Sequence, residues 1–403
     1  MGKKNHILVI ALLANEFFNN IILVGISLRI IVLLVLTLIA LKSVDLRKLR
    51  FNNYLLSLYF LYVFVTLAAT LFSGNFNLDG FLRKFFGYYT ITLLYTIIIP
   101  NIKITIQSYE KVINFIVTIG VVHLSLIVLQ YLGLDMFWSI PGWFSSDFAY
   151  LGNGMYKYSR KLNQISPVGL IDFTVTSGYL NLIFVPFYKY FKRNIYKIIF
   201  VCLLLISSLL LGQRSVLVIL IAYLLFDIFV KRNGFQITVK GIFISLVSMS
   251  IIYIALSSSY VMDTVSYKFQ RNLLDDENRL ILLTAVQSFF MSNFWVGGLI
   301  QYMALLETKT IAEITLPHNV FLNSFVMGGI FSLITSIWLF TSYFKYLWKN
   351  YKLANRSITF YPLFMSCLLI MLNSLFHNQG FSTNDNSFFL LFGLANIKVI
   401  YEN

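Results

Sequence analysis

Residues 198–230, IIFVCLLLISSLLLGQRSVLVILIAYLLFDIFV, form an apolar run that is too long for one membrane span. A helix of this length would extend roughly 50 Å at 1.5 Å per residue, whereas the hydrocarbon core of a bilayer is about 30 Å thick. The run is interrupted near its middle only by Gly212, Gln213 and Arg214. The chain must turn there, so the sequence predicts two membrane-spanning helices joined by a tight turn.

The rest of the chain has the same character. Of its 403 residues, 58% are hydrophobic and only 12% are charged, and the mean hydropathy is +0.78. A water-facing shell cannot cover so much apolar surface, so lipid must solvate most of it. The apolar runs lack the alternation of barrel strands, which predicts helices. We expect about twelve spans: 6–24, 27–42, 53–72, 85–101, 112–133, 168–188, 196–212, 215–230, 241–258, 319–344, 358–377 and 386–400.

The 31 Lys and Arg residues indicate how these spans are oriented. They form small groups between apolar runs rather than one basic face, which argues against a nucleic-acid partner. Placing both termini in the cytoplasm puts most of these residues in inner loops. Two outer segments, roughly 134–167 and 259–318, are long, so we expect the function to lie on the outer face. The predicted fold is an all-α polytopic transmembrane bundle, a single domain over 1–403, with a large outer loop before the tenth span.

Arg214 is the first residue that composition does not explain. The predicted turn places it at the outer membrane surface, where the positive-inside bias disfavours arginine. An arginine whose side chain merely reaches the lipid headgroups remains an equal alternative. Headgroup level is also where a lipid-linked phosphate would lie, so Arg214 is a candidate for binding it.

Arg279 is the second residue that composition does not explain. It follows Asp275, Asp276, Glu277 and Asn278 and opens an apolar segment that continues to Phe290. Acidic residues suit the positive end of a helix dipole, but an arginine in the first turn opposes it. Helix stability therefore does not explain Arg279, although a local ion pair on an interfacial helix is an alternative.

The pair His318 and Asn319 follows Pro317 at the predicted outer mouth of the tenth span. Histidine titrates near neutrality, so His318 could accept a proton from an incoming hydroxyl. The alternative is that these residues cap the helix. His377, at the outer end of the eleventh span, is a rival base, whereas we expect the mid-span His123 to be a packing residue.

Further cations are predicted on the outer face. Some of them hold loops near anionic headgroups, and together they make this face capable of binding an anion. We expect seven residues to contribute to substrate binding: Asn319, Arg271, Arg160, Lys161, Arg83, Lys84 and His377.

Several motifs are missing from the sequence. It has no Asp-x-Asp pair, no phosphate-binding glycine loop, no His-x-x-x-His and no Gly-x-Ser-x-Gly. Its two cysteines, Cys202 and Cys367, fall inside apolar runs and predict neither a disulfide nor a zinc site. We therefore expect no metal and no cofactor, and arginines would have to bind any diphosphate.

Three short pieces carry a family resemblance. They are Leu211-Gly212-Gln213-Arg214-Ser215; Arg279 leading into Phe294-Trp295-Val296-Gly297-Gly298; and Pro317-His318-Asn319-Val320-Phe321-Leu322 followed by Gly328-Gly329. In their order, spacing and predicted placement they resemble the O-antigen polymerase and O-antigen ligase superfamily. The likeness in topology covers essentially the whole chain.

The resemblance implies a metal-independent, inverting glycosyltransferase in the bacterial inner membrane, with its active site facing the periplasm. Its substrate would be an undecaprenyl-pyrophosphate-linked oligosaccharide, and its partners would be membrane lipid and a chain-length regulator protein. Arg214 and Arg279 would bind the pyrophosphate, and His318 would serve the acceptor. Because the motifs are present in loose form, we favour the polymerase over the ligase. A lipid-linked oligosaccharide flippase is the alternative from another class.

Overall fold

The computed structural model describes residues 5–15, 22–23, 26–44, 49, 52–72, 89–132, 134–140, 167–170, 174–211, 213–231, 234–235, 284–298, 302, 317, 319–354, 361–376, 381 and 387–400. These residues are mostly helical, as predicted, and strands occur among them only as three short pairs. The chain divides into two compact units. Unit 1 comprises residues 1–117 and 277–403, and unit 2 comprises residues 118–276. The prediction of a single membrane domain stays a prediction.

The helices have the apolar character of a membrane protein. In the described part of the chain, three helical stretches are long and apolar enough, by length and composition, to cross a bilayer: Ile106–Tyr131, Asn194–Leu211 and Val320–Tyr351, the last of which is broken at Gly328 and Gly329. Apolar side chains are also exposed along one helix, at Leu34, Val35, Leu38 and Ile39. Such a stripe is unfavourable in water and suited to lipid. The number of spans and their orientation stay predictions.

The predicted spans coincide well with the helices. The span at 241–258 lies outside the described residues, and each of the others overlaps a helix. The elements of unit 1 are α1 (Asn5–Asn15), β1 (Ile22–Leu23), β2 (Ile26–Ser27), α2 (Leu28–Ser43), α3 (Asn53–Phe72), α5 (Thr90–Ile97), η4 (Ile99–Asn101), β3 (Lys103–Thr105), a helical segment at 284–292, α14 (Val320–Ala354), α15 (Tyr361–Asn373), α16 (Ser387–Ala395) and β6 (Lys398–Ile400). The helix α6 (Ile106–Tyr131) begins in unit 1 and ends in unit 2.

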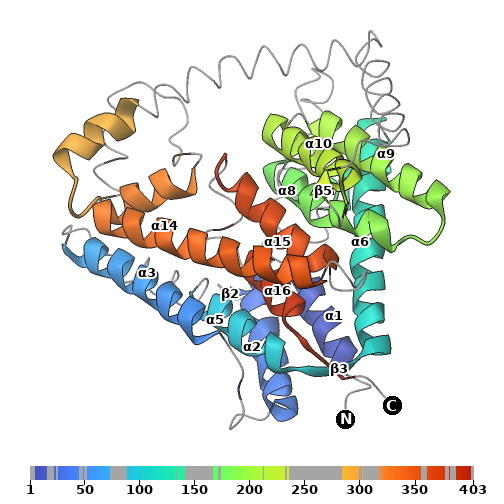
Figure 1. Ribbon diagram of the computed structural model, residues 1–403, viewed down its shortest axis with the longest axis horizontal. Helices are drawn as coiled ribbons and strands as arrows, with labels where there is room; N and C mark the ends of the chain where they lie inside the picture. Colours follow the sequence, from blue (N-terminus) through green and yellow to red (C-terminus); the bar gives the residue numbers. More distant parts are fainter. Residues whose placement is uncertain are drawn as a thin grey trace. The chain divides into compact units, whose positions relative to one another are not determined.

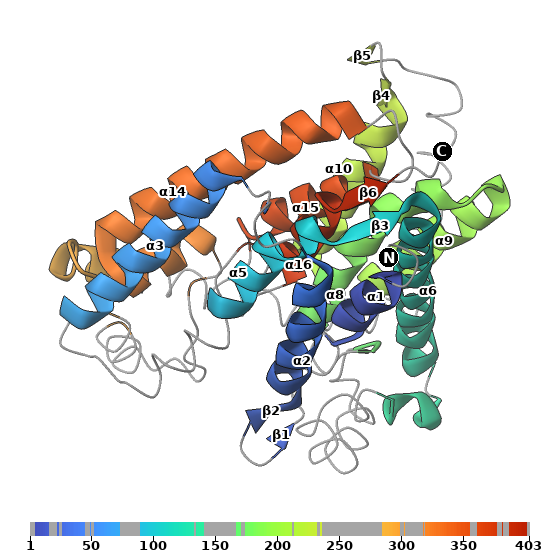
Figure 2. The same cartoon turned by 90° about the horizontal axis from the view of Figure 1, so that it is seen from below.

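Within unit 1, α3 and α14 lie side by side along their lengths (Figures 1 and 2). Two buried hydroxyl pairs join them: Tyr62 Oη lies 3.1 Å from Ser324 Oγ, and Thr66 Oγ1 lies 3.1 Å from Ser332 Oγ. Hydrogen bonds and small side chains hold helices together where lipid removes the hydrophobic driving force. This pair therefore forms the frame on which the candidate site is built.

One end of unit 1 is closed by a short parallel sheet. β3 pairs with β6 in a register that places Lys103 opposite Lys398. The side chain of Asn5 donates a hydrogen bond of 2.8 Å to the carbonyl of Lys103. The helix α1 and the strands β3 and β6 thus meet at this end, where the sequence predicts the cytoplasmic side.

Unit 2 is a small helical bundle. Its elements after α6 are η5 (Asp135–Trp138), α8 (Thr174–Phe184), η7 (Val185–Tyr190), α9 (Asn194–Leu211), α10 (Arg214–Phe229), β4 (Val230–Lys231) and β5 (Gly234–Phe235). α9 ends at Leu211 and α10 begins at Arg214, so the tight turn predicted in the long apolar run is confirmed. Near the end of α10, Asp227 forms an ion pair with Lys189 of η7 and accepts a hydrogen bond from Tyr188.

The side chain of Gln130 organises the segment that leads into α8. Its Oε1 accepts hydrogen bonds from the backbone N–H groups of Val168 (2.9 Å) and Gly169 (2.8 Å). Its Nε2 donates to the carbonyls of Gly169 (2.9 Å) and Phe137 (3.1 Å). One amide therefore satisfies four backbone groups, three of which belong to Val168 and Gly169, outside any helix or strand.

We predict that Gln130→Leu lowers the free energy of unfolding by about 2–3 kcal/mol, because the backbone groups of Val168, Gly169 and Phe137 lose the hydrogen bonds to its side chain. Thermal unfolding of the purified protein in detergent measures the loss. The matched control is Gln107→Leu, since Gln107 is exposed on the same helix. Equal melting temperatures for the two variants would contradict this role.

Candidate functional site

The helix α14 is broken at a double glycine. Gly328 and Gly329 have non-helical backbone angles, and φ of Gly329 is +67°, a value that favours glycine. The hydroxyls of Ser324 and Ser336 lie 3.0 Å apart. Twelve residues of straight helix would separate them by roughly 18 Å. α14 therefore consists of two arms, and the first arm at 320–327 folds back on the second arm at 330–354. The prediction of a single continuous span at 319–344 is wrong.

A second segment satisfies the backbone groups that this break releases. The N–H of Gly298 donates to the carbonyl of Val326 at 2.9 Å, and the N–H of Ile330 donates to the carbonyl of Phe294 at 2.9 Å. A broken helix is tolerated at membrane depth only where other groups bond its freed backbone. The segment 294–298 performs that task here.

The two double glycines of the sequence motifs lie in direct contact. A Cβ on Gly329 would come within 2.3 Å of the carbonyl oxygen of Trp295, and one on Gly297 within 2.5 Å of the nitrogen of Gly329. Gly297 also has a positive φ of 69°. Backbone packs on backbone with no room for any side chain, so both positions require glycine.

Aromatic rings surround this junction. Phe289 packs edge-on against Tyr302 and Phe325, with ring centroids 5.7 and 6.2 Å apart. Trp295 lies 6.0 Å from Phe331 of the second arm. Tyr302 is fully buried, and this burial raises the pKa of its hydroxyl to about 12. The rings of Phe289, Tyr302 and Phe325 are buried beside the junction, whereas Trp295 and Phe331 are exposed.

Asn319 fixes the start of the first arm. Its Oδ1 accepts hydrogen bonds from the N–H groups of Phe321 (2.8 Å) and Leu322 (3.2 Å), so it is the N-cap of α14. Its Nδ2 donates to the carbonyl of Leu375 at 2.8 Å, and the N–H of Val320 donates to the carbonyl of Ser374 at 3.0 Å. The capping role considered for this position is therefore present, and its predicted contact with substrate stays a prediction.

The arm that follows carries a buried polar residue. Asn323 is 6% exposed, and no described group is a hydrogen-bond partner for its Oδ1. Val320, Ser336 and Leu339 line one small cavity, so the beginning of the first arm lies about ten residues along the second arm from the break. That offset corresponds to roughly 15 Å of helix. The residues beside Asn319 therefore lie in the interior of unit 1 and not at the break in α14.

In unit 2, Arg214 is the first residue of α10. Before it, Gln213 lies so close to α8 that a Cβ on Gly178 would be 2.2 Å from its Oε1. One turn further along α8, Asn181 donates to Ser207 Oγ (3.1 Å) and Ser208 Oγ (2.9 Å) of α9. The α9–α10 turn thus packs closely against α8, and polar side-chain contacts join α8 to the last turns of α9.

Most of the predicted site residues lie outside the described residues. They are His318, Arg279, Arg271, Arg160, Lys161, Arg83, Lys84 and His377, and the side chain of Arg214 joins them. Their assembly into one site stays a prediction. Among the described residues, no group of three His, Cys, Asp or Glu side chains could hold a metal ion.

Outside the candidate site residues, the sequence predicted one buried polar residue correctly and missed two other features. His123 is a buried packing residue, as predicted: its Nδ1 accepts a hydrogen bond of 3.2 Å from the N–H of Leu170. The sequence reasoning missed Gln130, although a glutamine inside an apolar run was a usable signal. It also missed the contact between the two double glycines, for which the motifs alone give no distance.

No protein-family model matches the chain, and no curated protein sequence is significantly similar to it.

Proposed function

We propose that this protein is a membrane glycosyltransferase that polymerises undecaprenyl-pyrophosphate-linked oligosaccharide units into a surface polysaccharide. The observation that carries the proposal is the contact between Gly297 and Gly329, which belong to two of the three motif pieces. These two glycines are 32 positions apart in sequence, and their packing of backbone on backbone supports the interpretation that the two pieces form one functional assembly. Asn319, in the same piece as Gly329, begins the same broken helix.

The broken helix suits a diphosphate substrate. The N-terminus of a helix carries partial positive charge, and half-helices inside membrane proteins commonly direct this end at anionic groups. The first arm of α14 begins at Val320 in the interior of unit 1, directly after Pro317-His318-Asn319. Because the N–H groups at the start of this arm are already bonded within the protein, the helix dipole alone would stabilise a lipid-linked pyrophosphate near this end, and His318 would be adjacent to it along the chain.

The proposed reaction needs two kinds of group. The acceptor sugar hydroxyl attacks the anomeric carbon, the bond from that carbon to the pyrophosphate oxygen breaks, and the configuration inverts. His318 takes the hydroxyl proton as general base. Arg214 and Arg279 stabilise the charge that grows on the leaving pyrophosphate through bidentate contacts. The proposal places this chemistry at the periplasmic face of the inner membrane, with a chain-length regulator as a partner.

A second function is favoured by the same broken helix. Discontinuous helices form the substrate sites of many transporters, so a lipid-linked oligosaccharide flippase would also use one. A ligase that transfers finished glycan to lipid A core is the third candidate, from the same family resemblance. The three differ in the intermediate that accumulates when the protein is lost.

Deletion of the gene distinguishes the polymerase, the flippase and the ligase. We expect the deletion strain to carry core with a single repeat unit on a polysaccharide gel, and complementation with the wild-type gene to restore the ladder. Bare core with polymer left on the lipid carrier would assign the protein as a ligase. Bare core with single lipid-linked units on the cytoplasmic leaflet would assign it as a flippase, and an unchanged ladder would end the proposal.

A further inference from the structure

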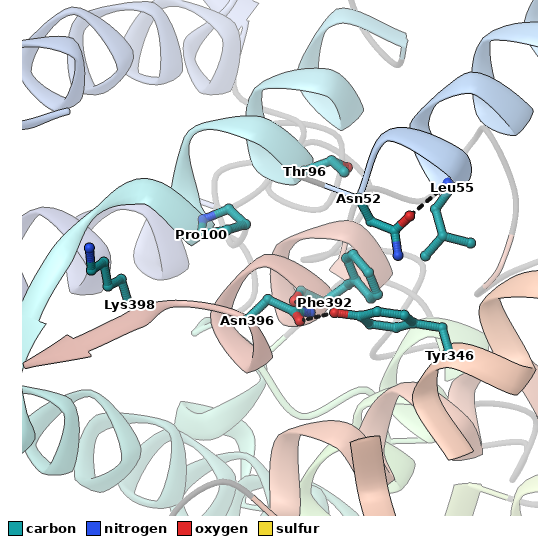
Figure 3. A pocket seen from close by; sticks show the side chains of 8 residues that line it. All are labelled: Asn52, Leu55, Thr96, Pro100, Tyr346, Phe392, Asn396 and Lys398. Atoms are coloured by element: carbon teal, nitrogen blue, oxygen red, sulfur yellow. Dashed lines mark hydrogen bonds between the residues drawn. The ribbon is translucent and has the colours of Figure 1, made fainter. Parts of the chain in front are cut away.

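Unit 1 contains a pocket at the end closed by β3 and β6, distinct from the α14 break. Its volume is about 390 Å³, which is within the range of small-ligand sites. Figure 3 shows residues of α3, α5, α14 and α16 and of the segments that adjoin these helices arranged around it. The lining residues that matter here are Asn52, Leu55, Tyr346, Phe392, Asn396 and Lys398.

Most acceptor groups of this pocket are used within the protein. Asn52 Oδ1 accepts a hydrogen bond from the N–H of Leu55 at 3.1 Å, and Asn396 Oδ1 accepts one from the hydroxyl of Tyr346 at 2.5 Å. The amide nitrogen of Asn396 donates to the carbonyl of Phe392 at 2.8 Å, which caps the end of α16. Both dashed bonds in Figure 3 belong to this internal set.

The groups that remain are donors. In Figure 3 the amide nitrogen of Asn52 points away from Leu55, toward Phe392 and Tyr346. Within the described residues, neither this nitrogen nor the ammonium of Lys398 has a hydrogen-bond or ion-pair partner. Asn52 also precedes α3, whose N-terminus adds partial positive charge. The pocket therefore offers a cation and an N–H group but few acceptors, a combination that suits an anion.

The surrounding charge has the same sign. Lys103 is paired in register with Lys398, and Lys345 and Lys349 lie on α14 beside the pocket residue Tyr346. All four side chains are exposed. In the described part of unit 1 the one acidic side chain is Glu110, which does not line the pocket. Among the described residues of unit 1, the charges near the pocket are therefore those that attract an anion.

We propose that this pocket binds the phosphate group of an anionic phospholipid. Leu55 and Phe392 supply apolar walls for the glycerol and upper acyl region, while Lys398 and Asn52 bind the phosphate oxygens. The helices around the pocket are apolar, and the sequence predicts that this end faces the cytoplasmic leaflet, where basic pockets between helices bind anionic headgroups. The site is separate from the proposed glycosyl transfer, and it does not depend on that function.

Native mass spectrometry of the full-length protein tests the site. The protein, purified in a neutral detergent, is titrated with phosphatidylglycerol, with phosphatidylcholine and with inorganic phosphate. We expect phosphatidylglycerol to bind most tightly. Lys398→Gln lowers its affinity roughly fivefold, because one lysine near an anionic headgroup contributes about 1 kcal/mol.

A second variant and a control make the result specific. Asn52→Asp keeps an oxygen that caps α3 but replaces the free N–H group with negative charge, so it also weakens phosphatidylglycerol binding. Lys111→Gln removes an exposed lysine of unit 1 outside the pocket and leaves binding unchanged. Equal binding of phosphatidylcholine, wild-type affinity in both pocket variants, or inorganic phosphate binding as tight as that of the lipid would each overturn the proposal.

Discussion

Gly329→Val prevents the protein from folding into a stable species. The residue has a φ of +67°, which a β-branched side chain strongly disfavours, and its Cβ would lie 2.3 Å from the carbonyl oxygen of Trp295. The obstructing atom is backbone, and that backbone is held by its own bonds to α14, so it has no alternative position. We expect a loss of more than about 4 kcal/mol, enough to unfold a protein of ordinary stability. Size-exclusion chromatography of the detergent-solubilised variant measures it.

The control for this variant is Gly120→Ala in α6. A Cβ there would lie 2.9 Å from Cγ and Cδ1 of Phe184, so this buried ring must move, but no backbone atom is in the way and Gly120 has no positive φ. Alanine also favours a helix by about 1 kcal/mol relative to glycine. We expect Gly120→Ala to fold with a modest change in melting temperature. A Gly329→Val protein that elutes as a single peak with wild-type melting temperature would contradict the double-glycine contact.

The second large effect concerns the proposed reaction. In the deletion strain, His318→Ala and Arg214→Ala restore no polysaccharide ladder, although both proteins reach the membrane. Loss of a general base costs roughly 10²–10⁴ in rate, and loss of an arginine that stabilises a leaving diphosphate costs a similar factor. Arg214→Lys restores at most a weak ladder, because lysine keeps the charge but not the bidentate contact.

A matched arginine provides the comparison. Arg193 is exposed at the end of unit 2 where the sequence predicts the cytoplasm, and its guanidinium lies 6.0 Å from the ring centroid of Tyr196. Arg193→Ala is expected to restore the full ladder. Full ladders from Arg214→Ala and His318→Ala would refute the site assignment, and labelling that finds position 214 on the cytoplasmic side would refute its topology.

The positions of the helices could be predicted from the sequence, because a helix that crosses a bilayer needs an apolar run of a minimum length. The span predicted at 53–72 coincides with α3, and the turn before Arg214 follows from the length of one apolar run. The start of α14 was also accessible, since asparagine is a preferred N-cap and Asn319 serves as one.

The break in α14 could not be predicted from the sequence. Hydropathy averages over a window, and Gly328-Gly329 lies in an apolar run that averages as a continuous span. Glycine is frequent in unbroken transmembrane helices, so its presence predicts no break. What decides the conformation is the segment 294–298, which supplies the bonds that the broken helix needs. Such long-range pairing depends on the fold rather than on local sequence.

The pairing of β3 with β6 has a consequence for the order of assembly in the cell. Lys103 meets Lys398, close to the C-terminal end of the chain, and unit 1 itself is made of two stretches separated by the whole of unit 2. A ribosome releases residues in sequence, and domains form as their residues become available. The continuous stretch 118–276 is complete first, while α3 and β3 meet their partners α14 and β6 only after that stretch has been made.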